Sequence, residues 1–413
     1  MPRSLTWLFA LGLLASFTQP VGNADIGFHL RIGRDILRSG HVPTADAYSF
    51  TARGTPYLDQ EWGSQVLLHL IHEAGGAGGL SLFEGLSVAG TFLVLLGAMP
   101  GSLPLRLGIL LLVTPLAAVH AMARPHVLGW LLIAALLRFQ ARGPAWRIPL
   151  LLALWANLHA SFALGVVLAA FHFLERRQFA WLAASLLAPL LNPYGWHLYG
   201  FLLMLKDLPL GLLGEFRPYA MNGHAFWVWS AYAALLAAGL IASRPCRPLI
   251  LLRAAALVAL GYGGMRYGVV AALALAPLQA GLWAPRFRPH RLLPWLLAGF
   301  MLLGTGFRIR DAKAGRLGID PDALPVAATR FLMESGVEGP LFNDYNFGGF
   351  LLWKAWPRFR VFVDGRMDVY RGAPLDDYLQ ALDARPGWED VLARRGIRCV
   401  LLRTHRALVK ALD

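Results

Sequence analysis

The segment LPLRLGILLLVTPLAAVHAMARPHVLGWLLIAALLRFQAR, residues 103–142, contains two long apolar runs with a short polar break at Arg124 and Pro125. Each run is close to the length that an α-helix needs to cross the ~30 Å apolar core of a bilayer. Arg138 and Arg142 follow the second run, as is usual at the cytoplasmic end of a membrane helix. The segment therefore predicts two membrane helices joined by a polar turn.

Similar windows recur along the chain and predict about nine to eleven membrane helices. The first window resembles a signal peptide, but we interpret it as an uncleaved membrane helix. The windows of roughly 15 to 20 apolar residues begin near Leu5, Gly79, Leu103, His126, Ile148, Phe162, Phe179, Ala225, Leu249, Tyr267 and Leu292.

Composition divides the chain into two regions. Of the 413 residues, 57% are hydrophobic and 15% are charged, whereas about 25% is usual for charged residues in soluble domains. Residues 1–307 contain only ten acidic residues, and the other 14 of the 24 lie in residues 308–413. We expect a transmembrane domain over residues 1–308 with a large outer loop, 21–78, followed by a soluble domain over 309–413. Alternating helix-like and strand-like segments in the tail predict a small α/β sheet, with strands near 339–343, 360–364 and 397–403.

The net charge of +14 does not indicate a nucleic-acid partner, because many arginines lie in short clusters between apolar runs. This pattern is typical of cytoplasmic loops and predicts a cytoplasmic N-terminus, with the first loop and the tail outside. The only two cysteines, Cys246 and Cys399, argue against a disulfide, a cysteine metal site and redox chemistry.

The first outer loop carries half of the acidic residues of the membrane region, namely Asp25, Asp35, Asp46, Asp59 and Glu61. Residues 26–37 and 64–72 are amphipathic, and we expect both to be helices lying in the membrane interface. One interpretation of the acids is structural, with helix caps and ion pairs to Arg31, Arg34 or Arg53. Asp25 favours a functional interpretation, because it lies where the chain leaves the membrane.

Polar residues within the apolar region form a second candidate set: Arg124, Asn157, His159, Asn192 and Arg266. Polar groups at this depth are costly and often functional, so together they predict a polar cavity. The alternative is that they satisfy backbone groups at helix breaks.

In the tail, Asn343, Asp344 and Tyr345 follow one predicted strand, and Asp364 and Arg366 follow the next. Ligands often bind at strand ends, which suggests an acceptor-binding surface. Helix capping by Asp344 and an ion pair from Asp364 to Arg366 form the structural alternative. Asp25 and His29 are only a weak metal pair, so a divalent cation stays open as a cofactor. No phosphate-binding loop, dinucleotide fingerprint or serine-hydrolase elbow is present.

Several motifs together resemble a largely uncharacterised family of bacterial polytopic membrane proteins related to the C-type glycosyltransferases. The motifs are Asp25-Ile-Gly-Phe-His29, Glu61-Trp62, Trp155-x-Asn157-x-His159, Asn192-Pro-Tyr-Gly195 and Val363-Asp364-Gly365-Arg366. The chain lacks the acidic doublet that many relatives carry after the first helix.

The resemblance implies an inverting transfer from a polyprenyl-phosphate-linked sugar at the outer face of the bacterial cytoplasmic membrane. It implies a catalytic acid in the first outer loop, which matches Asp25, with Asp46, Glu61 or Glu215 as a second acid. Arg124 and Arg266 would bind the donor phosphate, and the acceptor would be a glycan, a lipid or a protein. His29, Asn157, His159, Asn192 and Glu215 would line the cavity. A carrier or flippase for a lipid-linked solute and a non-catalytic polysaccharide assembly factor remain alternatives.

Overall fold

The computed structural model describes residues 2–205, 223–243, 246–290, 292–311 and 317–412. It divides the chain into two compact units. Unit 1 comprises Met1–Gln19, Ser81–Gly195 and Pro209–Leu317, and unit 2 comprises Pro20–Leu80, Trp196–Leu208 and Gly318–Asp413. The first loop and the tail thus belong to the same unit, although about 240 residues of sequence separate them.

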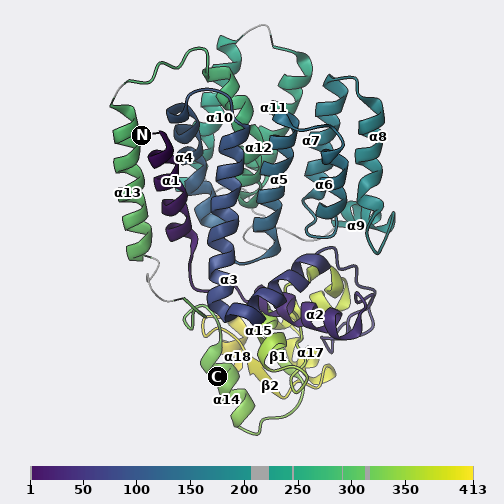
Figure 1. Ribbon diagram of the computed structural model, residues 1–413. Coiled ribbons are helices and arrows are strands. Elements are labelled where there is room, and N and C mark those ends of the chain that lie inside the picture. The colour runs from purple at the N-terminus through teal and green to yellow at the C-terminus, as the bar shows by residue number, and fades with distance from the viewer. Residues whose placement is uncertain (1, 206–222, 244–245, 291, 312–316, 413) are drawn as a thin grey trace. The chain divides into compact units, whose positions relative to one another are not determined.

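Unit 1 consists of apolar helices that run alongside one another (Figure 1). Its helices are α1 (Pro2–Phe17), the second half of α3 (Trp62–Ala98), α4 (Leu103–His120), α5 (Pro125–Arg142), α6 (Arg147–Trp155), α7 (Phe162–Glu175), α8 (Phe179–Leu187), the 3₁₀ turn η1 (Ala188–Leu190), α10 (His224–Ala242), α11 (Pro248–Gly263), α12 (Met265–Trp283) and α13 (Leu293–Asp311).

Four helices in the described part of the chain are long and apolar enough to cross a membrane: α3, α4, α10 and α12. They indicate a multi-pass membrane protein. Shorter apolar helices of 10–17 residues accompany them, among them α7 and α11. Residues 103–142 form two helices as expected, α4 and α5, with the break at residues 121–124. Of the two, α4 is among the four candidate membrane spans.

Helix α12 lies at the centre of unit 1, in contact with α4, α5, α10 and α11. Its buried positions are mostly small or aliphatic, including Gly268, Ala272 and Ala276. Small residues let helix backbones approach closely, which favours association of apolar helices in a bilayer.

Unit 2 contains short helices and a small sheet. Its elements are α2 (Asp25–Ser39), the first half of α3, α9 (His197–Leu205), α14 (Val326–Glu334), β1 (Leu341–Asn343), α15 (Tyr345–Lys354), the 3₁₀ turn η4 (Met367–Tyr370), α16 (Ala373–Leu382), α17 (Trp388–Arg394), β2 (Cys399–Leu401) and α18 (Ala407–Leu412).

The sheet of unit 2 is smaller than the sequence predicts. β1 and β2 pair in parallel, with Phe342 opposite Val400, and the helices between them make the connection that parallel strands require. The third expected strand, residues 360–364, makes an isolated bridge from Val361 to Ser49 of the first loop. In the described residues the fold is therefore predominantly α-helical, with a sheet of two three-residue strands.

Helix α2 packs on α15 through glycines on both sides. A Cβ at Gly27 would overlap the carbonyl of Gly349, and a Cβ at Gly349 would overlap the carbonyl of Ala24. A Cβ at Gly33 would likewise overlap the backbone of Gln65 in α3. These contacts bury much of the apolar face of α2, which the sequence analysis expected to lie in the membrane interface.

Helix α3 is broken at Gly76, where the backbone has φ 57° and ψ −152°. Side chains rarely tolerate this conformation, so the position favours glycine. The break separates the amphipathic segment predicted over residues 64–72 from the apolar run that begins near Gly79. One continuous stretch of sequence thereby contributes to both units.

Candidate functional site

Asp25 occupies the first turn of α2, where the helix dipole favours a negative charge. Its carboxylate lies against Gly365, where a Cβ would overlap Asp25 Oδ1. The hydroxyl of Tyr345 donates a hydrogen bond to the carbonyl oxygen of Gly365, at 3.3 Å. Asp25 and Tyr345 therefore meet at one glycine of the tail, and Asp25 remains partly exposed.

His29 follows Asp25 by one helical turn and is buried. Its Nε2 lies 3.9 Å from Oε2 of Glu61, whose side chain is 17% exposed. Two of the acids of the sequence prediction, Asp25 and Glu61, thus lie in the same unit, and His29 on α2 contacts the second of them.

Asp59 lies beside Glu61 and is buried, with 1% exposure. Its Oδ1 accepts hydrogen bonds from Gln65 Nε2 at 2.8 Å and from the Glu61 backbone N–H at 3.4 Å. Burial, reinforced by the negative charge of Glu61, raises the pKa of Asp59 to about 8. Asp59 therefore keeps its proton at neutral pH.

The sequence analysis gave Asp59 no role of its own. The available signal was its spacing of two residues from Glu61. Asp59 is buried, whereas the Glu61 side chain is 17% exposed. Neighbouring carboxyl groups in such different environments are typical of sites that move protons, and they also occur in structural ion-pair networks.

Arg366 is the centre of a buried ionic network. Its Nη1 lies 2.7 Å from Asp46 Oδ1, and its Nη2 lies 2.6 Å from Asp364 Oδ2. The hydroxyl of Tyr370 donates a hydrogen bond to the same Asp364 oxygen, at 2.6 Å. Burial alone would lower the pKa of Arg366, but the charges of Asp364 and Asp46 raise it well above its usual value.

Both oxygens of Asp46 are engaged in this network and in the loop around it. Oδ1 pairs with Arg366, and Oδ2 accepts a hydrogen bond from the Ser49 hydroxyl at 2.6 Å. Asp46 and Asp364 are 2% and 0% exposed. We therefore assign no catalytic step to Asp46 below, and no acceptor contact to Asp364 or Arg366.

Asn343 and Asp344 also have structural partners. Asn343 Nδ2 donates to the Val363 carbonyl at 2.8 Å, and its Oδ1 accepts from the Phe362 N–H at 2.8 Å. The side chain thus links β1 to the segment that does not pair as a strand. Asp344 caps α15 and forms a 2.7 Å ion pair with Arg406, as the capping alternative predicts.

A basic cluster of four side chains forms in unit 1: Arg124, His126, His159 and Arg266. His126 lies within electrostatic range of the other three, and His159 lies within range of both arginines. The two histidines are buried, whereas both arginines are partly exposed. Two arginines from distant parts of the sequence thus lie within electrostatic range of the same two buried histidines.

The basic cluster lies at helix N-termini. Arg124 is the N-cap of α5, Arg266 lies in the first turn of α12, and His159 precedes α7. The Nδ1 of His159 is 2.7 Å from Oγ of Ser161, the N-cap of α7. N-terminal backbone N–H groups add a positive potential to that of the side chains, which favours an anion.

Asn157, Asn192 and Glu215 are the remaining residues that the sequence predicted to line a cavity. Asn157 Nδ2 donates to the carbonyls of Ala153 and Leu191, each at 2.8 Å. Asn192 Oδ1 accepts from the Tyr194 N–H at 2.7 Å. Both asparagines therefore satisfy backbone groups at helix ends, as the structural alternative predicts. Glu215 lies outside the described residues.

The described residues contain no group of three or more His, Cys, Asp or Glu side chains arranged to hold a metal ion. The divalent cation that the sequence left open is therefore assigned no residues. No protein-family model and no curated protein matches the chain.

Proposed function

We propose that the protein is a membrane glycosyltransferase that uses a polyprenyl-phosphate-linked sugar donor. The observation that carries the proposal is the basic cluster of unit 1, in which Arg124 and Arg266 lie within electrostatic range of two buried histidines and belong to the N-terminal ends of α5 and α12. A phosphate on a lipid carrier has the charge that such a cluster attracts. Because the charge on the departing phosphate grows during sugar transfer, the cluster would stabilise the transition state more than the bound donor.

In the proposed reaction, Asp25 accepts the proton of the acceptor hydroxyl or amine while that atom attacks C1 of the sugar. The bond from C1 to the phosphate oxygen breaks, and polyprenyl phosphate leaves with the electron pair. Direct attack inverts the anomeric centre. Asp25 suits the role of base because it is a partly exposed carboxylate in the first turn of α2.

The proposal includes a topology and a setting. An odd number of membrane crossings, nine or eleven, would give a cytoplasmic N-terminus and an extracytoplasmic tail in a bacterial inner membrane. The first loop and the tail, which both belong to unit 2, would then face the outer compartment, where a glycan, lipid or protein acceptor is available. Tyr345, beside Asp25 and partly buried, is the tail residue that we assign to acceptor contact.

Binding of polyprenyl phosphate to the purified full-length protein tests the basic cluster. We expect Arg124→Gln combined with Arg266→Gln to weaken binding by at least about tenfold, since each charge-assisted hydrogen bond contributes roughly 1.5–3 kcal/mol. Arg142→Gln is the control, because Arg142 is exposed at the other end of the same helix α5 as Arg124. Equal binding by the double variant and the control would reject the phosphate site.

Release of polyprenyl phosphate from a panel of polyprenyl-phosphate hexoses tests the role of Asp25. Asp25→Asn removes the charge at constant volume, so we expect release to fall at least about a hundredfold, the usual contribution of a general base. Binding of polyprenyl phosphate should change less than twofold. Full release by the variant would reject Asp25 as the base. No release by the wild-type protein would point to a non-catalytic assembly factor or to a carrier, in which the same residues bind a lipid-linked solute without forming a bond.

A further inference from the structure

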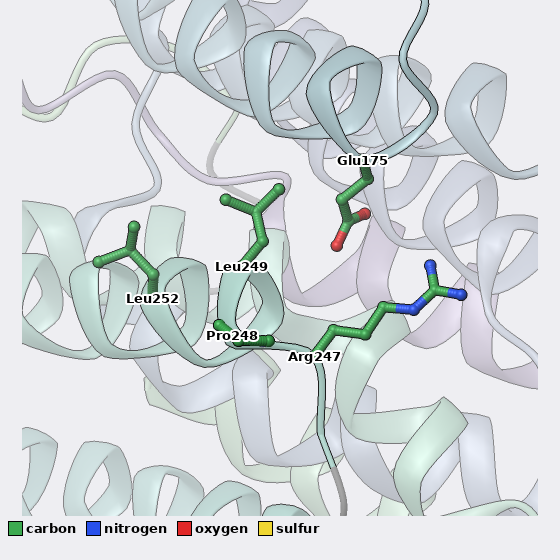
Figure 2. A pocket seen from close by; sticks show the side chains of 5 residues that line it. All are labelled: Glu175, Arg247, Pro248, Leu249 and Leu252. Carbon is green, nitrogen blue, oxygen red and sulfur yellow. The ribbon is translucent and has the colours of Figure 1, made fainter.

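An open pocket of about 560 Å³ lies in unit 1 between the end of α7 and the beginning of α11. Its lining residues are Glu175, Arg247, Pro248, Leu249 and Leu252. Figure 2 shows Glu175 extending from α7 and Arg247 from the start of α11 toward the same space. The volume falls in the range of small-molecule sites.

One wall of the pocket is apolar. Pro248, Leu249 and Leu252 follow one another along the first turns of α11, and Leu252 is 59% exposed. Leu174, next to the lining residue Glu175, is 44% exposed. Both α7 and α11 are apolar helices. The pocket therefore borders surface that acyl chains would cover in a membrane.

The polar side of the pocket is basic. Glu175 is the one acid of the lining, whereas Arg247 lines it and Arg176 follows Glu175 in sequence. Arg253 lies within electrostatic range of Glu175. Within the lining, Glu175 and Arg247 balance each other in charge, and Arg253 near Glu175 adds a positive charge, so a bound anion would meet a positive local charge.

Because an apolar wall and a basic opening adjoin, we infer that this pocket binds an anionic phospholipid, with the phosphate at Arg247 and an acyl chain along Leu249 and Leu252. Basic pockets between membrane helices are known to bind such head groups. Pro248 fixes the backbone of the residue before it in an extended conformation, and Arg247 has φ −63° and ψ 136°. This conformation directs the arginine away from the axis of α11, towards the pocket. The site is separate from the basic cluster and does not depend on the proposed transfer reaction.

Titration of the full-length protein with dioleoylphosphatidylglycerol and with dioleoylphosphatidylcholine, followed by native mass spectrometry, tests the inference. The two lipids have the same acyl chains, so a difference reports the head group. We expect phosphatidylglycerol to bind at least about threefold more tightly. Arg247→Gln should weaken its binding about fivefold, since one basic residue near an anionic lipid surface contributes about 1 kcal/mol, and should leave phosphatidylcholine within twofold.

Two further variants and a competitor complete the design. Arg288→Gln is the control, because Arg288 is an exposed arginine that does not line the pocket. Leu252→Asn, which places an amide on the apolar wall, should weaken both lipids. Equal affinity for the two lipids, or equal effects of Arg247→Gln and Arg288→Gln, would overturn the inference. Complete displacement of phosphatidylglycerol by millimolar inorganic phosphate would overturn it as well, because the site would then bind the phosphate without the lipid.

Discussion

Replacing Arg366 by methionine should destabilise unit 2 more than any surface charge change, because it removes the counter-ion of two buried carboxylates. Asp46 and Asp364 are 2% and 0% exposed, so water does not solvate them in the folded protein. Removing one partner of a buried ion pair costs about 3–5 kcal/mol, because the other charge stays buried without compensation.

Two contacts reduce the expected cost. Asp46 keeps the hydrogen bond from the Ser49 hydroxyl, and Asp364 keeps that from the Tyr370 hydroxyl, each at 2.6 Å. Methionine also preserves most of the apolar volume of the arginine stem. We therefore expect the lower end of the range, about 3 kcal/mol, which raises the population of the unfolded unit roughly a hundredfold.

Pulse proteolysis of the full-length protein in detergent, with cleavage sites in unit 2 monitored, measures this population. Arg385→Met is the matched control, since the ion pair of Arg385 with Asp383 is 58% and 48% exposed and such pairs contribute about 0–1 kcal/mol. Equal cleavage of the two variants at neutral pH would refute a stabilising role for the network.

Three further substitutions test the fold. Burial raises the pKa of Asp59 from 3.8 to about 8, so the protonated carboxyl stabilises the fold fully below pH ~4, and this stabilisation is lost as the pH rises to about 8. Asp59→Asn should remove this pH dependence. In denaturant titrations, the wild type should therefore lose on the order of 4 kcal/mol of unfolding free energy relative to the variant between pH 4 and 7. Gly76→Ala should cost about 1–3 kcal/mol because of its positive φ, whereas Gly75→Ala, with open space at its Cβ, should be neutral or stabilising in the same thermal melts. Gly27→Ala should lower the melting temperature by several degrees, since the new methyl group overlaps the Gly349 carbonyl; an unchanged melting temperature would contradict the close approach of α2 and α15.

Local patterns in the sequence predicted the helices well. The apolar periodicity of residues 26–37 predicts α2, and that of 64–72 predicts the first half of α3. Both patterns depend on residues within one or two helical turns, so a single sequence contains the information. The apolar windows at residues 103–142 were equally informative for α4 and α5.

Periodicity did not show what covers an apolar face. The sequence analysis expected lipid against α2, yet much of that face packs on α15, some 320 residues later in the chain. Gly27 and Gly349 allow the backbones of α2 and α15 to approach closely. The sequence around a helical glycine does not show which other segment packs against it. The missing third strand has a similar cause, because Val361 bridges to the first loop and such long-range pairing is not encoded in a local pattern.

The environments of the loop acids differ in a way that the loop sequence alone could not show. Asp46 and Asp59 are the same residue type in the same loop. Arg366 neutralises Asp46 in an ion pair, whereas Asp59 lies next to Glu61 and keeps its proton. The loop sequence alone does not show which of the two carboxyl groups is ion-paired and which is protonated.

The roles of the other loop acids narrow the choice of a general base. Asp35 pairs with Arg31 and accepts a hydrogen bond from the Tyr48 hydroxyl, each at 3.0 Å. A base must be ionised, accessible to its substrate and able to take a proton without breaking the fold. Asp35 and Asp46 hold ion pairs and Asp59 is already protonated, so none meets all three conditions. Asp25 is partly exposed and lies against Gly365, so its replacement is the most informative test of the proposed function.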